Sequence, residues 1–204
     1  MAFLLAHTLF FVRHGQTDWN AAGRLQGQTD TQLNARGCAQ AVQAGRTLAK
    51  LVRKSPDSAC ALDTVHFVSS PLTRCVDTMA HLRETVGLTP LSTPTDPRLQ
   101  EIGFGDWQGK TWSQVVSDHS DLVEARKRQL WTFQPPNGES YAELAARVEA
   151  ALAELPGNTL MVSHGGVGRV LLCLIGGVVR HQALTASIPQ GRVLVFQNGR
   201  ADWV

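Results

Sequence analysis

The sequence has few of the features that define several large classes of protein. Its 204 residues contain no hydrophobic run that approaches the length of a membrane span. Its four cysteines are far apart and form no C-x-x-C pair: Cys38, Cys60, Cys75 and Cys173. We therefore expect free thiols in a reducing compartment, and neither a disulfide framework nor a zinc site. Internal repeats and low-complexity segments are also missing from the sequence.

The sequence also has no large excess of positive or negative charge. Nineteen lysines and arginines oppose 17 aspartates and glutamates, so the net charge is only +2. This balance gives no sign of a nucleic-acid partner or an acidic membrane surface. The apolar residues 1–12 have no basic segment of the kind that opens a signal peptide. The composition therefore predicts a soluble, cytoplasmic protein with no membrane and no nucleic-acid partner, and it says nothing of the oligomeric state.

Apolar residues, in contrast, are plentiful. They make up 43% of the chain, which is enough for a full core, and we expect residues 1–204 to form one domain. Predicted strands alternate with predicted helices, an order typical of an α/β fold with a mostly parallel sheet between helices. We expect strands at residues 9–12, 64–68 and 159–163, and a C-terminal hairpin of residues 193–197 and 200–204.

Helix signals fall between these strands. The expected helices are residues 34–54, a helix that opens at Ser69-Ser70-Pro71, residues 140–155 with a capping box of Ser140 and Glu143, and residues 167–175. Residues from about 98 to 138 are rich in glycine, tryptophan and proline. We expect them to form an irregular insertion that folds over one edge of the sheet.

Two of the predicted strands end in the same unusual way. Arg13-His14-Gly15 follows the first strand directly, and His164-Gly165-Gly166 follows the strand of residues 159–163. The carboxyl ends of parallel strands meet at one edge of a sheet, where ligands bind in open α/β folds. The sequence therefore predicts a functional site at this edge.

The charges gathered there indicate the kind of ligand. Arg13, His14 and His164 come from two strand exits, and Arg74 lies in the first turn of the helix after a third. Arginine side chains match phosphate oxygens in pairs, and the backbone N–H groups of glycine turns and helix ends add fixed donors. No carboxylate belongs to these turns. A phosphate group is the predicted ligand.

These residues belong to a longer pattern that resembles the histidine phosphatase superfamily, whose fold is phosphoglycerate-mutase-like. Six ordered blocks of sequence carry the resemblance: residues 13–20, residues 23–27 with 30–37, Ser69-Ser70-Pro71-Leu72-Thr73-Arg74, Glu101 with residues 105–109, residues 136–140, and Ser163-His164-Gly165-Gly166. The resemblance implies a three-layer α/β/α sandwich with a mostly parallel sheet.

It also implies a role for each residue of the site. His14 would attack the phosphorus and become a phosphohistidine, while Arg13, Arg74 and His164 stabilise the transferring group. The expected further contacts to the phosphate are Thr17, Asn20, Gln26, Gly27 and Gly165. Glu101 matches the general acid of the family, with Asp106 as its nearest rival. We expect no metal and no cofactor, because the arginines already supply the positive charge.

The same resemblance leaves three activities open. Hydrolysis of a small phosphate monoester is favoured, because the pattern is nearest to the cofactor-independent broad-specificity and α-ribazole-phosphate phosphatases. A phosphoglycerate mutase primed by 2,3-bisphosphoglycerate is the alternative, but Phe104 stands where mutases have a tyrosine, and residues 112–136 are too short for their insertion. A silent module that binds a phosphorylated ligand is the third.

Aromatic residues in the insertion suggest a further property. We expect five of them to form an apolar rim around the phosphate pocket: Phe104, Trp107, Trp112, Trp131 and Phe133. Such a rim predicts a preference for hydrophobic or aromatic leaving groups.

Overall fold

The computed structural model describes residues 5–54, 64–89 and 93–204. Its strands form one five-stranded sheet in the order β2-β3-β1-β4-β5. The strands are β1 (Leu9–Arg13), β2 (His66–Ser69), β3 (Thr159–Ser163), β4 (Val193–Gln197) and β5 (Arg200–Trp203). β1, β2 and β3 run parallel, whereas β4 and β5 join the sheet antiparallel. The sheet is thus mixed with a parallel core, as the sequence predicts.

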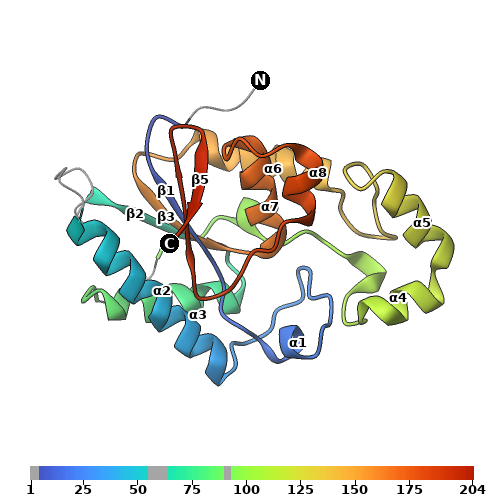
Figure 1. The fold of residues 1–204 in the computed structure, drawn as a ribbon. Helices are drawn as coiled ribbons and strands as arrows, with labels where there is room; N and C mark the ends of the chain where they lie inside the picture. Colours follow the sequence, from blue (N-terminus) through green and yellow to red (C-terminus); the bar gives the residue numbers. More distant parts are fainter. Residues whose placement is uncertain (1–4, 55–63, 90–92) are drawn as a thin grey trace.

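Helices cover both faces of this sheet (Figure 1). α2 (Ala35–Lys54) and α3 (Thr73–Thr85) lie on one face. α6 (Tyr141–Ala153), α7 (Gly165–Leu174) and α8 (Arg180–Thr185) lie on the other. The fold is therefore the expected three-layer α/β/α sandwich.

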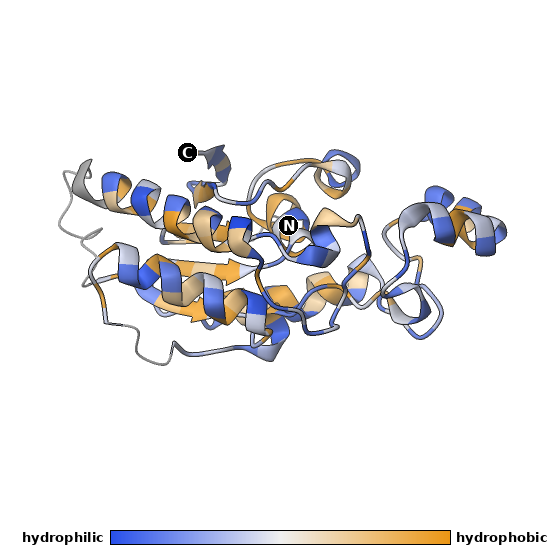
Figure 2. Ribbon diagram, turned by 90° about the horizontal axis from the view of Figure 1, so that it is seen from below, coloured by the Kyte–Doolittle hydropathy of each residue, from blue (hydrophilic) through white to orange (hydrophobic). Residues whose placement is uncertain are grey.

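The alternation of side chains along β1 explains why both faces are covered. Phe10 and Val12 belong to the core beneath α2 and α3, and Leu9 and Phe11 to the core beneath α6 and α7. Successive side chains of a strand point to opposite faces, so a wholly apolar strand needs a cover on each side. Figure 2 shows the hydrophobic strands between helices of mixed hydropathy. Each such buried side chain contributes about 1.5–3 kcal/mol to stability.

Several local predictions are confirmed. The Asn34 side chain accepts a hydrogen bond from Gly37 N at 2.9 Å and so begins α2, and Ser140 and Glu143 form the expected capping box of α6. In the C-terminal hairpin, Asn198 and Gly199 have φ of 52° and 71°, which suits its tight turn. α7 begins at Gly165, two residues before the predicted start, because His164 already has the extended backbone of an N-cap.

The insertion is more regular than expected. It contains α4 (Trp112–Asp118) and α5 (Ser120–Arg128), preceded by the 3-10 turn η4 (Gly105–Trp107), while η3 (Pro97–Leu99) overlaps its start. Thr111 and Gln114 form a capping box that starts α4, a signal that the sequence carries. α4 and α5 project from the body of the molecule, away from the sheet (Figures 1 and 2).

Three cysteines are free thiols, as predicted: Cys38, Cys75 and Cys173. Cys60 lies outside the described residues. Among the described helices, none is both long and apolar enough to cross a membrane.

Candidate active site

A cavity of about 160 Å³ opens where β1 and β3 end. Arg13 pairs with Ser163 in the sheet register, so His14 and His164 leave adjacent strands at the same level. Twelve residues line the cavity: Arg13, His14, Asn20, Arg24, Leu25, Gln26, Gly27, Arg74, Glu101, Phe104, Gly165 and Arg169. The site thus lies at the carboxyl edge of the parallel strands, where the sequence predicts it.

His14 is held in a defined orientation within this cavity. Its backbone N–H donates to Ser163 O at 2.9 Å, and its Nδ1 lies 2.7 Å from Gly15 O. A carbonyl oxygen only accepts, so this contact places the ring proton on Nδ1 and leaves a lone pair on Nε2. Gly15 also packs directly on the backbone of Gly37, where a Cβ would overlap the carbonyl group. The turn after β1 therefore requires glycine.

The surroundings keep this imidazole neutral. The pKa of His14 lies well below its ordinary value because burial disfavours the charged ring, and the charges of Arg13 and Arg74 lower it further. The hydrogen bond to Gly15 opposes this shift but does not outweigh it. The side chain is only 1% exposed. An unprotonated imidazole nitrogen has the lone pair that a nucleophile needs.

Arg13 and Arg74 carry donors with no partner among the described residues. Arg13 donates from Nη1 to Ile188 O, and Arg74 donates from its two Nη atoms to Thr29 O and Gly27 O. The Nε atoms of both arginines are buried and unpaired. Buried donors without partners are costly, so an anion in the cavity would relieve two of them at once.

Two residues with amide side chains, Asn20 and Gln26, line the cavity. Oδ1 of Asn20 accepts from Gln190 Nε2 at 3.0 Å, and Oε1 of Gln26 accepts from Thr17 Oγ1 at 2.8 Å. Because the oxygens are occupied in this way, the NH₂ groups remain for a ligand. Asn20, Gln26 and Gly27 all line the cavity, and their contact with a phosphate stays a prediction.

Thr17 does not line the cavity, contrary to expectation. It is fully buried and caps α1 (Asp18–Ala21), accepting from Asn20 N at 3.1 Å while its hydroxyl donates to Gln26. Its hydroxyl is therefore used twice inside the protein. Thr17 thus holds the two amides in place, and its expected contact with the phosphate stays a prediction.

His164 also lies behind the cavity instead of lining it. It is fully buried, and its ring meets that of His14 edge to face, with centroids 5.2 Å apart. Its Nε2 is 2.8 Å from Ser70 Oγ and 3.4 Å from Cys75 Sγ. Burial, with Arg74 and His14 nearby, keeps its pKa well below the ordinary value. The ring packs against that of His14, and its expected contact with the phosphate stays a prediction.

Glu101 is the one acidic residue among those that line the cavity. Its Oε1 accepts from the backbone N–H of both Ile102 and Gly166 at 2.9 Å. Glu101 Oε2 and the Arg13 guanidinium lie on the same side of Gly165. A Cβ placed on this glycine would be 3.6 Å from the guanidinium and 3.8 Å from Oε2. Oε2 accepts a longer bond, from Gly166 N at 3.3 Å, and is the freer oxygen; it faces the same space as Arg13. Its rival Asp106 lies elsewhere and pairs with Asn137 Nδ2 at 3.1 Å.

The aromatic rim is largely absent. Of the five expected residues only Phe104 lines the cavity. Trp107 is fully buried and forms a small core with Val115 and Val123, while Phe133 stacks on it. Trp107, Trp112 and Phe133 thus pack together inside the insertion, whereas Trp131 packs against the main core and under Arg180.

Two arginines of the cavity were missed by the sequence reasoning. Arg24 comes from the loop after α1, and Arg169 from the second turn of α7. Arg169 stands four residues after Gly165, so helical spacing places both on one face, a signal that the sequence contains. No sequence pattern identifies Gln190, which reaches Asn20 from 170 residues away. In the part of the chain that the structure describes, no three His, Cys, Asp or Glu side chains are grouped to hold a metal ion.

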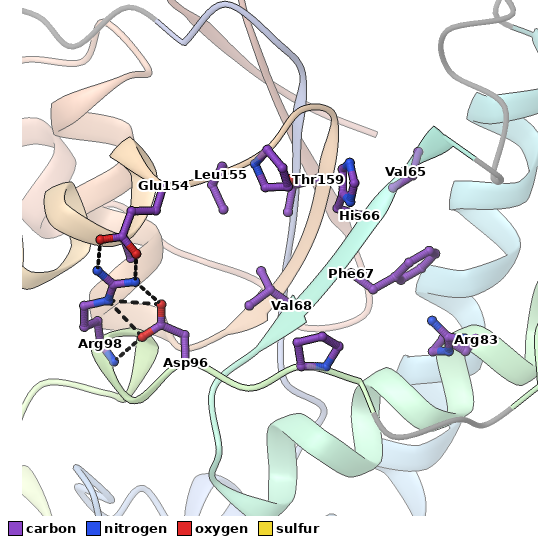
Figure 3. A pocket seen from close by; sticks show the side chains of 13 residues that line it. Val65, His66, Phe67, Val68, Arg83, Asp96, Arg98, Glu154, Leu155 and Thr159 are labelled. Atoms are coloured by element: carbon purple, nitrogen blue, oxygen red, sulfur yellow. Dashed lines mark hydrogen bonds and ion pairs between the residues drawn. The ribbon is translucent and has the colours of Figure 1, made fainter.

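A larger hollow of about 440 Å³ lies at the opposite, amino ends of the strands, near His66 and Thr159 (Figure 3). Arg98 lines this hollow near α6 and forms ion pairs with Asp96 at 2.8 Å and with Glu154 at 2.7 Å. These carboxylates neutralise Arg98, and the other arginine of the hollow, Arg83, lies over the Phe67 ring and donates to Thr89 O. The smaller cavity at the carboxyl ends is therefore the candidate site.

The two buried histidines make stability depend on pH. Both stay neutral in the folded protein, whereas an unfolded histidine takes up a proton at a pH near 6.5. The unfolded state then binds more protons below that pH, so stability is full above it and is lost as the pH falls. The slope approaches about 1.4 kcal/mol per pH unit for each histidine.

Urea unfolding at pH 7.5, 6.5 and 5.5 measures this effect. We expect the free energy of unfolding to fall between pH 6.5 and 5.5, and to fall less steeply in His14→Asn and His164→Asn. Equal slopes in all three proteins would show that other groups are responsible.

Comparison with known proteins places this site in a family. Residues 9–204 match the model of the histidine phosphatase superfamily, branch 1. The chain is 36% identical over 175 residues to the glucosyl-3-phosphoglycerate phosphatase of Mycobacterium tuberculosis, covering 79% of this chain and 72% of that protein. It is 35% identical over 180 residues to the "Probable phosphoglycerate mutase GpmB" of Klebsiella pneumoniae, covering 84% and 74%.

A solved structure agrees. The alpha-ribazole phosphatase of Shigella flexneri superposes with a TM-score of 0.73 at 25% identity, over 97% of this chain and 94% of that one. Fold, motif order and sequence similarity give the same answer. The chain belongs to branch 1 of the histidine phosphatase superfamily.

Proposed function

We propose that this protein hydrolyses phosphate monoesters through a phosphohistidine intermediate on His14. The observation that carries the proposal is the Nε2 lone pair of His14 in a cavity with two unpaired arginine donors. A nucleophile beside an anion site suits phosphoryl transfer. Two of the three relatives described above are named as phosphatases, which supports the same activity.

In the first step, His14 Nε2 forms a bond to phosphorus while the bond from phosphorus to the leaving oxygen breaks. Arg13 and Arg74, with the amides of Asn20 and Gln26, bind the phosphoryl oxygens and stabilise their charge. Oε1 of Glu101 accepts the two shorter N–H bonds, which leaves Oε2 as the oxygen that would act as the acid in this mechanism. Oε2 gives a proton to the leaving alcohol.

In the second step, water attacks the phosphohistidine. The bond from the water oxygen to phosphorus forms, the bond to Nε2 breaks, and Glu101 takes up a proton from the water. His14 returns to its neutral form, which its burial favours. The arginines carry the positive charge for both steps, so the mechanism as proposed uses no metal ion.

The proposal extends to the organisation of the chain. Residues 1–204 act as one domain, and the segment at about 98–138 provides Glu101 and Phe104 to the cavity and sets the choice of substrate. The free thiols of Cys38, Cys75 and Cys173 support a reducing, cytoplasmic location.

A phosphoglycerate mutase is the alternative, because one relative carries that name. A panel of phosphate monoesters separates the two activities, with 3-phosphoglycerate offered both with and without 2,3-bisphosphoglycerate. We expect release of inorganic phosphate with no requirement for the bisphosphate. Isomerisation that is faster than phosphate release would establish the mutase, and no turnover at all would leave a binding module.

A further inference from the structure

We propose that Arg147 and Glu139 are positioning residues for the general acid: their ion pair holds the segment of residues 98–103, so that the carboxylate of Glu101 stays in the cavity. This inference rests on the proposed function, in which Glu101 gives a proton to the leaving alcohol. Neither Arg147 nor Glu139 lines the cavity. Both act on the reaction through the backbone that carries Glu101.

The segment that carries Glu101 has no regular secondary structure to hold it. The 3-10 turn η3 ends at Leu99, and residues 101–104 belong to no helix or strand. The carbonyl groups there depend on other donors, since buried backbone oxygens without partners are costly. All four carbonyl oxygens of residues 98–101 accept hydrogen bonds from side chains, and three of them accept from Arg147.

Arg147 of α6 binds these carbonyl groups with both of its terminal nitrogens. Its Nη1 donates to Arg98 O at 2.6 Å and to Gln100 O at 2.7 Å. Its Nη2 donates to Glu101 O at 3.0 Å. Gln28 adds only a longer and exposed bond to Glu101 O, at 3.2 Å. One guanidinium group therefore ties three carbonyl groups of the segment to α6.

Glu139 completes the arrangement on the other side of Glu101. Its Oε1 accepts from Arg147 Nε at 2.7 Å, and its Oε2 accepts from Nη2 at 2.8 Å. Oε2 also accepts from Gly103 N at 3.1 Å, and the backbone N–H of Glu139 donates to Gly103 O at 2.8 Å. All five N–H donors that a guanidinium group carries are thus used. The chain is fixed both before and after Glu101.

The ion pair is sheltered, and its geometry follows from α6. The Arg147 and Glu139 side chains are only 20% and 16% exposed, so water screens the pair less than it would screen a surface ion pair. Glu139 precedes Ser140, the N-cap of α6, and Arg147 lies about two turns into the helix. Side chains of a helix lean toward its N-terminus, which brings the guanidinium back to Glu139. Lysine has three donors and no planar fork, so it cannot make the same contacts.

The Glu101 carboxylate is in place only if its backbone is in place. Oε1 accepts from Ile102 N and Gly166 N, both at 2.9 Å, and a small shift of the segment would break the second contact. A misplacement of about 1 Å can cost about 10²-fold in rate. Loss of the Arg147 donors should therefore weaken proton transfer by Glu101. His14, which directly follows β1, should keep its place.

Arg147→Lys and Glu139→Gln test this role, because each keeps the approximate size of the side chain and breaks part of the pair. We expect both variants to lower kcat for an alkyl phosphate by about tenfold to a hundredfold, and to lower it much less for p-nitrophenyl phosphate, whose leaving group needs no proton. Arg147→Lys should cause no further loss when it is added to Glu101→Gln. Arg83→Lys is the matched control, since Arg83 is a partly exposed arginine of α3 outside the cavity, and it should change neither rate.

The outcomes separate this inference from the proposed function. An equal loss with both esters, or no loss, in folded Arg147→Lys and Glu139→Gln would overturn the positioning role while hydrolysis stands. If the wild-type protein hydrolyses neither ester, the proposed function fails, and hydrogen exchange of the backbone N–H groups then tests the positioning alone. We expect Ile102 and Gly166 to exchange at least about tenfold faster in Arg147→Lys, with Phe11 of β1 unchanged. Unchanged exchange at Ile102 and Gly166 would overturn the inference.

Discussion

Replacing His14 by alanine is expected to lower kcat/KM for phosphate ester hydrolysis by at least about 10⁴-fold, the scale seen when a covalent nucleophile is removed. The lone pair of Nε2 is the one nucleophile that the cavity lining places beside Arg13 and Arg74. Glu101, the other group of the lining with lone pairs to give, is assigned to proton transfer, so the covalent step depends on His14. Release of inorganic phosphate from p-nitrophenyl phosphate measures the loss.

His181→Ala is the matched control, because His181 is exposed on α8 and does not line the cavity. It should keep full activity. Thermal unfolding of both variants verifies that they are folded. A folded His14→Ala protein with more than about a hundredth of wild-type activity would contradict covalent catalysis on this residue.

The second large effect concerns the general acid. We expect Glu101→Gln to lower kcat by about 10²–10⁴-fold for an alkyl phosphate, because an amide has no acidic proton to give. The loss should be much smaller for p-nitrophenyl phosphate, whose leaving group needs no proton. Steady-state kinetics with both esters measures the difference. An equal loss with both would contradict the role of Glu101 as an acid.

Gly166→Ala tests the position of the same carboxylate without removing it. A Cβ on Gly166 would overlap Glu101 Oε1 and lie 3.2 Å from Ile102 Cγ2, so the carboxylate must move. We expect a loss with the same dependence on the leaving group, and no further loss when Gly166→Ala is added to Glu101→Gln. Gly157→Ala is the control, since its Cβ would meet only His66 at 3.7 Å. Additive losses would place the effect of Gly166→Ala elsewhere.

The sequence predicts the frame of this site well for a physical reason. Strand exits at Arg13-His14-Gly15 and His164-Gly165-Gly166 are local patterns, and parallel strands bring their ends together wherever the chain folds in this way. The layers follow from equally local rules, namely the apolar runs of β1 and β3 and the caps at Asn34 and Ser140. Local rules therefore predict most of the fold.

The errors arose where long-range packing decides. Whether Trp107 faces the cavity or a core depends on Val115 and Val123, which no local pattern connects to it. Thr17 belongs to the motif, but only the contact with Gln26 shows that its hydroxyl is already used. His164 is turned toward Ser70 and Cys75 by residues some 90 positions away. Side-chain direction was thus the missing information.

The most direct test of the account is to identify the phosphorylated atom. The protein would be mixed with a phosphate ester, quenched in alkali during turnover, and examined by ³¹P NMR and by mass spectrometry of its peptides. We predict one acid-labile, alkali-stable phosphoryl group on Nε2 of His14, absent from His14→Ala. Turnover with no phosphoenzyme after rapid quenching, or a phosphoryl group on another residue, would contradict the account.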